Sequence, residues 1–409
     1  MNKKKHKVPP QSGVLERVLT GAQAAITAID SGSVTLDDLL DRAPDDCRRM
    51  LEHLLMQFYR YRKSIRASWQ KYCRKKPSVH ISSLLDAAVT QCFFQSQVNT
   101  YSVVNVAVML AGTEHADKFV NAVLRSVLRE GYKFPKTAQE ILPEAILKRW
   151  KKSFSAEDIE RFAGLFLQKP PFTFRLCAGC ADLPEKSSEI SAFEPFRFAA
   201  GSAAAVLDST EFAAGKYYIQ DPAASMAVSL AKDILPGCGA LLDLCAAPGG
   251  KTLMAAELLA PGARITAADI SEKRQKLTAE NFKLRNISAR IITADPAEVQ
   301  GSFDFVIADM PCSNTGVFRH RPDALWRFSE KSLAEVMEVQ KHILHHAAGL
   351  TAEGGYLLLS TCSIEEDENT FPAEELEGFT LIESRTLLPE KEHDGAFAAL
   401  WQKKCGILP

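Results

Sequence analysis

Two cysteines, each just after an apolar segment, are the residues of this chain best suited to covalent chemistry. Cys312 follows the strand-like segment 303–308, and Cys362 follows the strand-like segment 356–359. Because parallel strands of one sheet end at the same edge, we expect both thiols to face one pocket. A thiolate can add to a substrate and so split a difficult substitution into easier steps. The pair predicts covalent catalysis, and methyl transfer to carbon-5 of a pyrimidine needs chemistry of this kind.

The reaction explains why an acid should accompany the thiols. Carbon-5 of cytosine becomes nucleophilic only after a thiolate adds to carbon-6 and converts the ring to an enamine. Loss of the carbon-5 proton and of the thiol then completes the cycle. Asp309, close before Cys312, is placed to act as an acid near ring atom N3, which requires a carboxyl group with a raised pKa. From the residues alone, either cysteine could attack while the other assists release.

A glycine-rich turn for a nucleotide-like cofactor precedes both thiols. Residues 243–252 read DLCAAPGGKT, which predicts a strand, a turn and the start of a helix. The segment is not a P-loop, because Cys245 stands where the motif G-x-x-x-x-G-K-[ST] requires its first glycine. The dinucleotide motif G-x-G-x-x-G is absent as well. The sequence therefore disfavours a phosphate ligand.

Acidic residues at the ends of the following strands favour a cationic, hydroxyl-rich ligand. Asp269 ends the second strand, where an α/β nucleotide site places a carboxylate on ribose hydroxyls. Asp295 follows the third strand and is suited to accept a hydrogen bond from an adenine amino group. Asp309 follows the fourth strand. Any one of them alone could simply cap a turn, but three in succession point to S-adenosylmethionine, a sulfonium attached to adenosine.

The elements that must position these residues begin with helices. Residues 14–130 keep apolar side chains at helical spacing and have weak strand signals, which predicts an all-helical domain. A mixed stretch interrupted by prolines follows and is expected to be a small connecting subdomain. The predicted domains are 1–135 (helical), 136–215 (connecting) and 216–409 (catalytic).

The last part of the chain alternates apolar strand segments with amphipathic helices. This order predicts an α/β fold with a parallel sheet covered on both faces. Segments 379–383 and 396–401 are expected to add edge strands. The other strands are expected at 240–244, 265–269, 290–293, 303–308 and 356–359, and helices at about 251–260, 272–285 and 330–350.

Overall charge does not indicate a nucleic-acid binder, so any such contact must come from a local surface. The 409 residues contain 49 Lys and Arg against 50 Asp and Glu, a net charge of −1. Residues 47–76 hold ten basic side chains against a single acid, with aromatic residues interleaved. This segment is either an RNA contact or a solvated helix face. Arg319, His320 and Arg321 could hold phosphates, whereas Trp326 is expected in a core rather than under a base.

Several other classes of protein are excluded or disfavoured. The ten cysteines are scattered and form no disulfide framework, which favours a reducing cytoplasm. Cys177 and Cys180 form a lone C-x-x-C without a second ligand pair, so no metal is expected. The basic segment 1–7 is followed by prolines instead of an apolar stretch and is not a secretory signal. No apolar run is long enough to cross a bilayer.

Taken together, these motifs resemble the Nop2/Sun family of RNA cytosine-5 methyltransferases. The resemblance rests on segments 218–226, 243–252, 309–317 and 360–363, with Arg319, Glu368 and Asn369, and on the ending 393–397. It covers the C-terminal half of the chain. The helical part, best seen in 119–125, is similar to the NusB-like RNA-binding domain of a bacterial member of the family that methylates ribosomal RNA.

The resemblance implies a Rossmann-like class I methyltransferase domain and specific roles in it. Cys362 matches the nucleophile, and Cys312 matches the cysteine that aids product release. Asp309 and Lys251 match further catalytic positions, Lys251 near the target base. The residues that match cofactor-binding positions are Cys245, Ala246, Ala247, Pro248, Gly249, Gly250, Lys251, Asp269, Asp295 and Asp309.

The expected function is methyl transfer from S-adenosylmethionine to carbon-5 of a cytosine in small-subunit (16S) ribosomal RNA through a cysteine–carbon-6 adduct. The enzyme is expected to be a cytoplasmic monomer without a membrane partner. Two alternatives remain: the same reaction on tRNA, and a non-catalytic RNA-binding or assembly factor. The presence of both thiols and of Asp309 disfavours the second alternative, because a binding module needs none of them.

Overall fold

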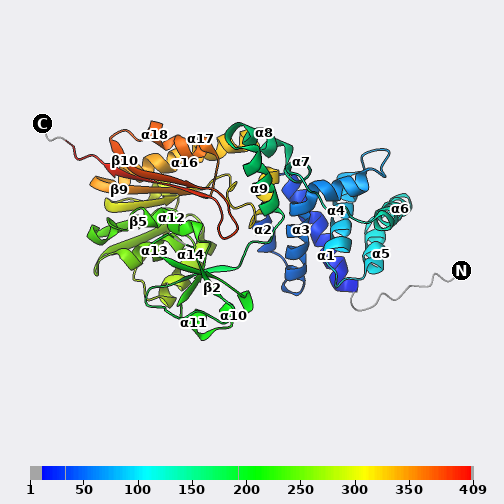
Figure 1. The fold of residues 1–409 in the computed structure, drawn as a ribbon, viewed down its shortest axis with the longest axis horizontal. Helices are drawn as coiled ribbons and strands as arrows, with labels where there is room; N and C mark the ends of the chain where they lie inside the picture. The colour runs from blue at the N-terminus through cyan, green and yellow to red at the C-terminus, as the bar shows by residue number, and fades with distance from the viewer. Residues whose placement is uncertain (1–11, 33, 192, 407–409) are drawn as a thin grey trace. The chain divides into compact units, whose positions relative to one another are not determined.

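The structure of the chain, a computed structural model, describes residues 12–32, 34–191 and 193–406 (Figure 1). The expectation about segment 1–7 lies outside the described residues. By its internal contacts the chain divides into two compact units. Unit 1 consists of Met1–Gln168 and Arg321–Phe328, and unit 2 of Lys169–His320 and Ser329–Pro409. The expected boundary at 135/136 falls inside unit 1, and the boundary at 215/216 falls inside unit 2.

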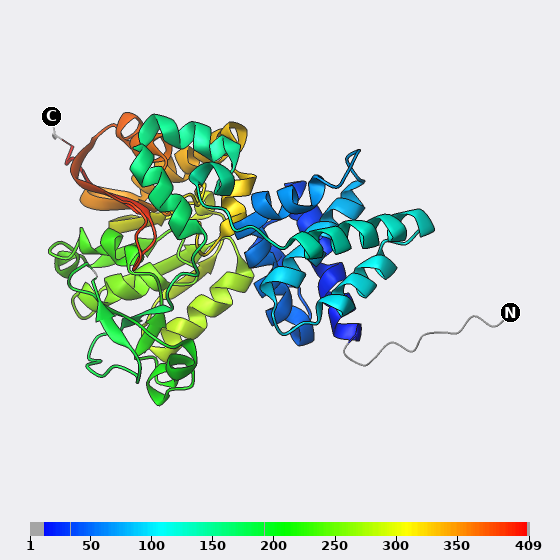
Figure 2. The ribbon, with the colours of Figure 1, turned by 45° about the vertical axis from the view of Figure 1, so that its right-hand side comes forward.

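Unit 1 is helical, as Figure 2 shows for its blue and cyan ribbons. Side-chain caps start several of its helices: Ser78, Asn99 and Thr113 each accept a hydrogen bond from a backbone N–H of the first turn. The helices are α1 (Ser12–Asp30), α2 (Leu36–Leu40), α3 (Asp45–Gln70), α4 (Val79–Phe94), α5 (Thr100–Leu110), α6 (Glu114–Glu130), α7 (Ala138–Ile141), α8 (Glu144–Ser153), α9 (Ala156–Phe166) and α15 (Pro322–Arg327).

The core of unit 1 forms around α3, which is apolar on one face and carries cations on another. Leu54, Leu55 and Phe58 are fully buried in it. A buried polar contact adds specificity, because Asp86 on α4 accepts hydrogen bonds from Trp69 Nε1 and Arg66 Nε, each at 2.9 Å. The all-helical expectation for this region is confirmed.

Helix α15 belongs to unit 1 although it lies far along the chain. Trp326 Nε1 donates to the Tyr59 carbonyl at 2.7 Å, and the Arg62 guanidinium lies 4.9 Å from the centre of the Trp326 ring. Asp323 accepts from the backbone N–H of Leu36 at 3.2 Å. Trp326 is therefore a packing residue, as expected, and does not stack a base.

Unit 2 contains a small antiparallel sheet and a large mixed sheet. The small sheet has the order β2-β3-β1-β4. Its elements are β1 (Thr173–Leu176), β2 (Ser188–Ile190), β3 (Arg197–Ala200) and β4 (Tyr217–Ile219), accompanied by α10 (Ala203–Leu207) and α11 (Thr210–Ala213).

The large sheet has the order β10-β11-β9-β8-β5-β6-β7, in which β5 to β9 run parallel. Its strands are β5 (Ala240–Asp243), β6 (Arg264–Asp269), β7 (Arg290–Thr293), β8 (Phe303–Asp309), β9 (Thr351–Thr361), β10 (Phe379–Leu387) and β11 (Ala396–Lys403). The helical elements between them are α12 (Ala223–Ser229), η1 (Leu235–Gly237), α13 (Gly250–Leu258), α14 (Glu272–Leu284), η2 (Pro296–Glu298), α16 (Glu330–Leu350), α17 (Glu366–Thr370) and α18 (Pro372–Glu375).

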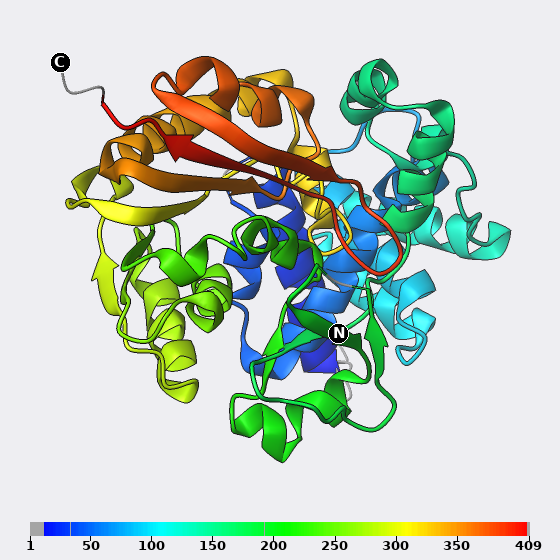
Figure 3. The ribbon, with the colours of Figure 1, turned by 60° about the vertical axis from the view of Figure 1, so that its left-hand side comes forward.

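Helices cover both faces of the large sheet. Alternate residues of each strand point to opposite faces, so neighbouring residues pack against different helices. Leu242 and Leu359 pack with α16 on one face, whereas Leu241 and Leu358 pack with α12 and α13 on the other. The α/β fold class is confirmed. The expectation for 396–401 needs one correction: β11 is an inner antiparallel strand between β9 and β10, so of these two strands β10 alone lies at an edge (Figure 3).

No helix among the described residues has both the length and the apolar character needed to cross a membrane.

Candidate active site

The two cysteines lie together at the carboxyl ends of two adjacent strands. Strands β8 and β9 pair in parallel, with Asp309 opposite Ser360, and each chain then turns into a loop. These loops bring Cys312 Sγ and Cys362 Sγ to 3.0 Å from one another. Both are free thiols and partly exposed.

Asn314 connects the two cysteine loops. Its backbone has a φ of 60°, an uncommon value that asparagine tolerates better than most residues. In this conformation its Oδ1 accepts a hydrogen bond from the Cys362 thiol at 3.2 Å, and its Nδ2 donates to the Cys312 carbonyl at 2.8 Å. Hydrogen bonding to Cys362 and burial raise the pKa of the Cys312 thiol well above its ordinary value. Cys312 is thus held as a neutral thiol beside Cys362.

Glu368 on α17 forms hydrogen bonds with both cysteine loops. It is fully buried, and its carboxylate accepts hydrogen bonds from the backbone N–H and hydroxyl of Ser313 and from the hydroxyl of Ser363. Gln340 of α16 donates to the same carboxylate at 3.0 Å. Burial raises the pKa of Glu368, although these donors oppose that shift. One carboxylate therefore fixes the residues that follow both cysteines.

The loop after Cys312 also needs a residue without a side chain. A Cβ on Gly316 would lie 2.7 Å from the Cys362 carbonyl oxygen and 2.6 Å from that of Gly395. The Gly316 N–H instead donates to the Cys362 carbonyl at 2.9 Å. Only glycine allows this close approach.

Lys251 places a positive charge beside the thiols. Its ammonium lies 2.7 Å from Asp309 Oδ2, and Asp309 Oδ1 accepts from the Ser360 hydroxyl at 2.7 Å. Burial opposes the charged form of Lys251, but Asp309, Asp243 and Cys362 outweigh burial and raise its pKa. Each oxygen of Asp309 therefore has a donor beside it, Lys251 for one and Ser360 for the other.

The turn after β5 borders a cavity of about 200 Å³. Gly249 has a φ of 99°, which glycine adopts without strain, and it lets the chain enter α13 directly. The cavity reaches from this turn to Lys251 and Asp309. Its lining residues are Tyr218, Ile219, Gln220, Asp243, Cys245, Ala246, Ala247, Pro248, Gly250, Lys251 and Asp309.

Two buried oxygens in the cavity lining have no partner among the described residues. They are Oδ1 of Asp243 and Oε1 of Gln220. Burial raises the pKa of Asp243 to about 7, although the Thr252 hydroxyl donates to its other oxygen at 2.6 Å. Unpartnered acceptors suit a ligand with N–H or O–H donors and repel a phosphate. The residues present therefore fit S-adenosylmethionine.

The other predicted cofactor residues differ in where they lie relative to this cavity. Asp269 is buried behind the turn, where it accepts from the backbone N–H groups of Ala247 (3.1 Å) and Ser271 (2.9 Å). Asp295 is exposed and caps the 3-10 turn η2. Neither residue lines the cavity. Burial raises the pKa of the Cys245 thiol, which makes it a lining residue without nucleophilic character.

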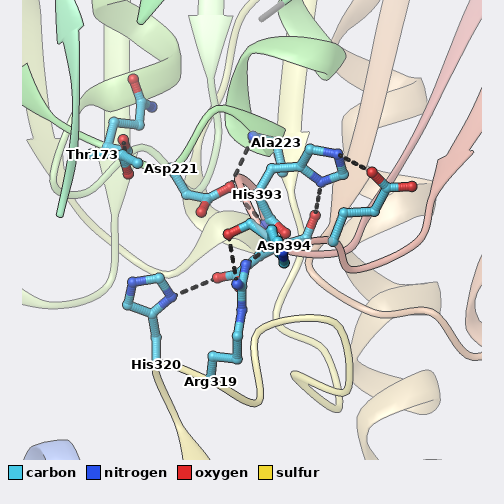
Figure 4. Close-up of polar contacts among 10 residues, drawn as sticks. Thr173, Asp221, Ala223, Arg319, His320, His393 and Asp394 are labelled. Atoms are coloured by element: carbon cyan, nitrogen blue, oxygen red, sulfur yellow. Dashed lines mark hydrogen bonds and ion pairs between the residues drawn. The ribbon is translucent and has the colours of Figure 1, made fainter. Parts of the chain in front are cut away.

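Arg319 and His320 converge on Asp394 instead of facing RNA (Figure 4). Arg319 is buried, bonds to Asp394 at 3.3 Å and donates to the carbonyl of His393 at 2.7 Å. His320 Nδ1 lies 2.6 Å from the other oxygen of Asp394, whose backbone N–H donates to Asp221 at 3.0 Å. The expectation that Arg319 holds RNA phosphates is therefore wrong, because burial and pairing consume its charge.

Asp221, His320 and Asp394 also offer three atoms that all lie within 4.8 Å of one another, as metal ligands do. The adjacent Arg319 guanidinium already neutralises Asp394, and His320 is bonded to the same carboxylate. We interpret the group as a hydrogen-bond network that fastens the loop after Cys312 to the turn before β11.

Sequence reasoning missed the roles of Asn314, Glu368 and Gln220. Glu368 lies among four consecutive acids, and only the fold distinguishes it from the exposed Glu366 and Asp367. Its spacing from a cysteine could have identified it: Glu368 stands six residues after Cys362, in a stretch that resembles the family.

Two family models match the chain. Residues 238–376 match 16S rRNA methyltransferase RsmB/F, and residues 22–129 match the NusB family.

Curated relatives of the chain are named as ribosomal RNA small subunit methyltransferases. The probable ribosomal RNA small subunit methyltransferase B of Bacillus subtilis is 29% identical over 316 residues, 71% of this chain and 70% of that protein. The ribosomal RNA small subunit methyltransferase B of Serratia proteamaculans is 33% identical over 288 residues, 64% of this chain and 63% of that protein. Its counterpart in Photorhabdus laumondii is 40% identical over 164 residues, 39% of this chain and 37% of that protein. The last two alignments span less than two thirds of the relatives.

Solved structures share the fold. The crystal structure of PH0851 has a TM-score of 0.73 at 20% identity and covers 98% of this chain and 100% of its own. NSun6 from Pyrococcus horikoshii, crystallised with SFG, has a TM-score of 0.51 at 17% identity, with 64% of this chain and 98% of its own covered. At these identities the likeness establishes the fold alone.

Proposed function

We propose that this chain, whose residues 238–376 match the 16S rRNA methyltransferase RsmB/F model and whose residues 22–129 match the NusB family, methylates carbon-5 of a cytosine in 16S ribosomal RNA. S-adenosylmethionine would supply the electrophilic methyl group. The observation that carries the cytosine-5 proposal is the pair of partly exposed thiols, 3.0 Å apart, beside Lys251. Methylation of an exocyclic nitrogen or a ribose hydroxyl would need neither sulfur.

Cys362 is the proposed nucleophile. Asn314 accepts a hydrogen bond from its thiol and so orients it, and the Lys251 ammonium is close enough to interact with Cys362 electrostatically. Addition of the thiolate to carbon-6 would make carbon-5 an enamine carbon that attacks the methyl group. Loss of the carbon-5 proton and cleavage of the sulfur–carbon bond would restore the aromatic ring. Cys312, kept as a neutral thiol, is the proposed partner in that release step.

Asp309 and Lys251 are proposed to position the base. With both oxygens accepting hydrogen bonds, Asp309 is suited to accept from the amino group or a protonated N3 of cytosine. Lys251 holds Asp309 in place and adds positive charge where the enamine accumulates electrons. Asp243 and Gln220 line the cavity, and each has a buried oxygen without a partner among the described residues; these oxygens would accept from donor groups of the cofactor.

The test compares two single substitutions at the thiols. Cys362→Ala should lower methylation by at least about 10³-fold, because no adduct can form, while cofactor affinity stays within about 2-fold. Cys312→Ala should instead accumulate an RNA–protein adduct that survives a denaturing gel. Bisulfite mapping of total RNA from cells with and without the protein locates the modified cytosine. Activity in Cys362→Ala would refute the covalent step, and a modified tRNA would replace 16S RNA as the substrate.

A further inference from the structure

The basic segment 47–76 divides into an inner part that is neutralised and an outer part that is free. Arg62 and Arg66 pair with Asp30 of α1 at 2.9 and 2.7 Å, and Arg66 also pairs with the buried Asp86 at 2.8 Å. Arg60 is buried. These side chains hold α3 against α1 and α4. Because Asp30 and Asp86 compensate the charges of Arg62 and Arg66, the inner part of the segment is a packing surface and not an RNA contact.

The outer part lies where α3 has ended. Arg74, Lys75 and Lys76 are exposed, and none of them forms a hydrogen bond or ion pair with another described residue. Three consecutive cations without an acid nearby in sequence repel one another. Such an arrangement is stabilised when an anion binds.

Cations at the end of α6 and just after it extend this group. Tyr72 donates to the Ser126 carbonyl at 3.4 Å and to the Glu130 carboxylate, and Lys71 pairs with Glu130 at 2.5 Å. These contacts place the end of α6 beside the end of α3, where Arg129 is exposed. Lys133 follows α6, is 85% exposed and lies 3.7 Å from the same Glu130 carboxylate, so Glu130 is the one acid among these described cations.

An exposed aromatic ring follows the last of these cations in the chain. Phe134 comes directly after Lys133 and is 60% exposed. It packs edge-on against Tyr132 and against Tyr61 of α3, with ring centres 5.0 and 5.8 Å away, so the ring lies beside α3 itself, whereas Arg74, Lys75 and Lys76 follow the end of that helix. Cations beside an exposed ring are typical of surfaces that bind single-stranded nucleic acid, since phosphates pair with the cations and a base stacks on the ring. We call the group the α3–α6 surface; it consists of Arg74, Lys75, Lys76, Arg129, Lys133 and Phe134.

We propose that the α3–α6 surface binds a single-stranded segment of the substrate RNA, with the cations on phosphates and Phe134 under a base. The proposal rests on the proposed function, in which the substrate is RNA. The net charge of the whole chain is −1, so this local excess of positive charge is what distinguishes the surface. The surface would hold RNA outside the catalytic cavity and raise affinity without taking part in methyl transfer.

Binding of a labelled single-stranded RNA of about 12 nucleotides to the full chain, followed by fluorescence anisotropy at several salt concentrations, tests this proposal. The triple variant Arg74→Gln, Lys75→Gln, Lys76→Gln should lose about 10-fold or more in affinity at low salt. The slope of log affinity against log salt should become shallower by about 2, because three phosphate contacts disappear. Phe134→Ala should lose about 5-fold or more with an unchanged slope, and Phe134→Trp should restore the loss.

A matched control removes three exposed lysines from α8 of the same unit: Lys148→Gln, Lys151→Gln and Lys152→Gln. It should change affinity by less than about 2-fold. Equal losses in both triple variants would mean a generic charge effect and overturn the proposal, as would an unchanged salt slope in the first. Because binding is read without methylation, an inactive enzyme that still shows the difference would refute the proposed function and leave the surface standing. Binding of an acidic protein but not of RNA would also overturn it.

Discussion

Asp243 is a buried carboxyl group in the cavity lining, and its protonation should make ligand binding there depend on pH. The strand β5 carries it into a fully buried position, where the Thr252 hydroxyl donates to one oxygen and the other has no partner among the described residues. Burial therefore raises its pKa from 3.8 to about 7. Below that value the group is neutral, and above it the free oxygen is a charged acceptor.

We expect the affinity for S-adenosylmethionine to rise as pH increases through about 7. The gain should be about 10-fold, because a hydrogen bond to a charged acceptor is stronger than one to a neutral group. Asp243→Asn should flatten this dependence. Calorimetric titration at several pH values measures it, and the titration of the cofactor itself cancels in the ratio of the two proteins. A parallel rise in both proteins would exclude Asp243 as the cause.

The stability of the ligand-free protein should change in the opposite direction. Since the folded pKa lies above the unfolded one, the contribution of Asp243 is fully present below about pH 4 and is lost as pH rises through about 7. Ionised Asp243 therefore lowers the stability of the ligand-free protein, and a ligand that donates a hydrogen bond to it can offset this cost.

At the scale of elements, the short helix α17 forms hydrogen bonds with two loops and with α16. It presents Glu368 to the loop after β8, to the loop after β9 and to Gln340 of α16. The strands alone bring the cysteines to one edge of the sheet. The Glu368 carboxylate restricts how each cysteine loop leaves its strand. The distance between the two sulfurs depends on the path of these loops.

Glu368→Gln should destabilise the protein by about 1–3 kcal/mol, because an amide N–H₂ would replace an acceptor that faces only donors. It should also lower kcat by about 10-fold or more through misplacement of the thiols, while cofactor affinity stays unchanged. Denaturant unfolding and single-turnover methylation measure the two effects. Glu366→Gln on the same helix is exposed and serves as the control. A folded Glu368→Gln enzyme with full kcat would contradict the positioning role.

At the scale of the whole molecule, the two units are interleaved in sequence. Unit 1 includes α15, which is flanked on both sides by residues of unit 2. Leu325 is fully buried, and Trp326 and Asp323 supply hydrogen bonds to the backbone of α3 and to the start of α2. The segment 1–168 is consequently an incomplete helical unit.

We expect a fragment of residues 1–168 to melt at a lower temperature than the same fragment mixed with a peptide of residues 319–330. The peptide restores buried apolar area and the partners of Tyr59 and Leu36, and ligand-like binding should raise the melting temperature by several degrees at about 100 times its dissociation constant. Thermal denaturation followed by circular dichroism measures this shift. A peptide with Trp326→Ala and Asp323→Ala is the control, and an equal shift with that peptide would refute the assignment.

The amino-acid sequence by itself determined the local features of this protein. Apolar segments such as 240–244 and 265–269 became strands within a residue or so of the expected ends, because periodicity and turn residues act over short distances. The turn at Gly249 and the positions of both cysteines after their strands were predictable for the same reason.

Only the tertiary structure decided which side chains meet. Glu368 and Glu366 are the same residue type two positions apart, yet packing turned one inward and left the other in water. Arg319 and Arg62 are of a residue type that often contacts RNA. Asp394 and Asp30, which are distant in sequence, neutralise them instead. The 3.0 Å separation of the sulfurs and the place of α15 likewise depend on contacts between residues far apart along the chain. Burial and pairing over such distances follow from the packing of whole elements, which no local pattern encodes.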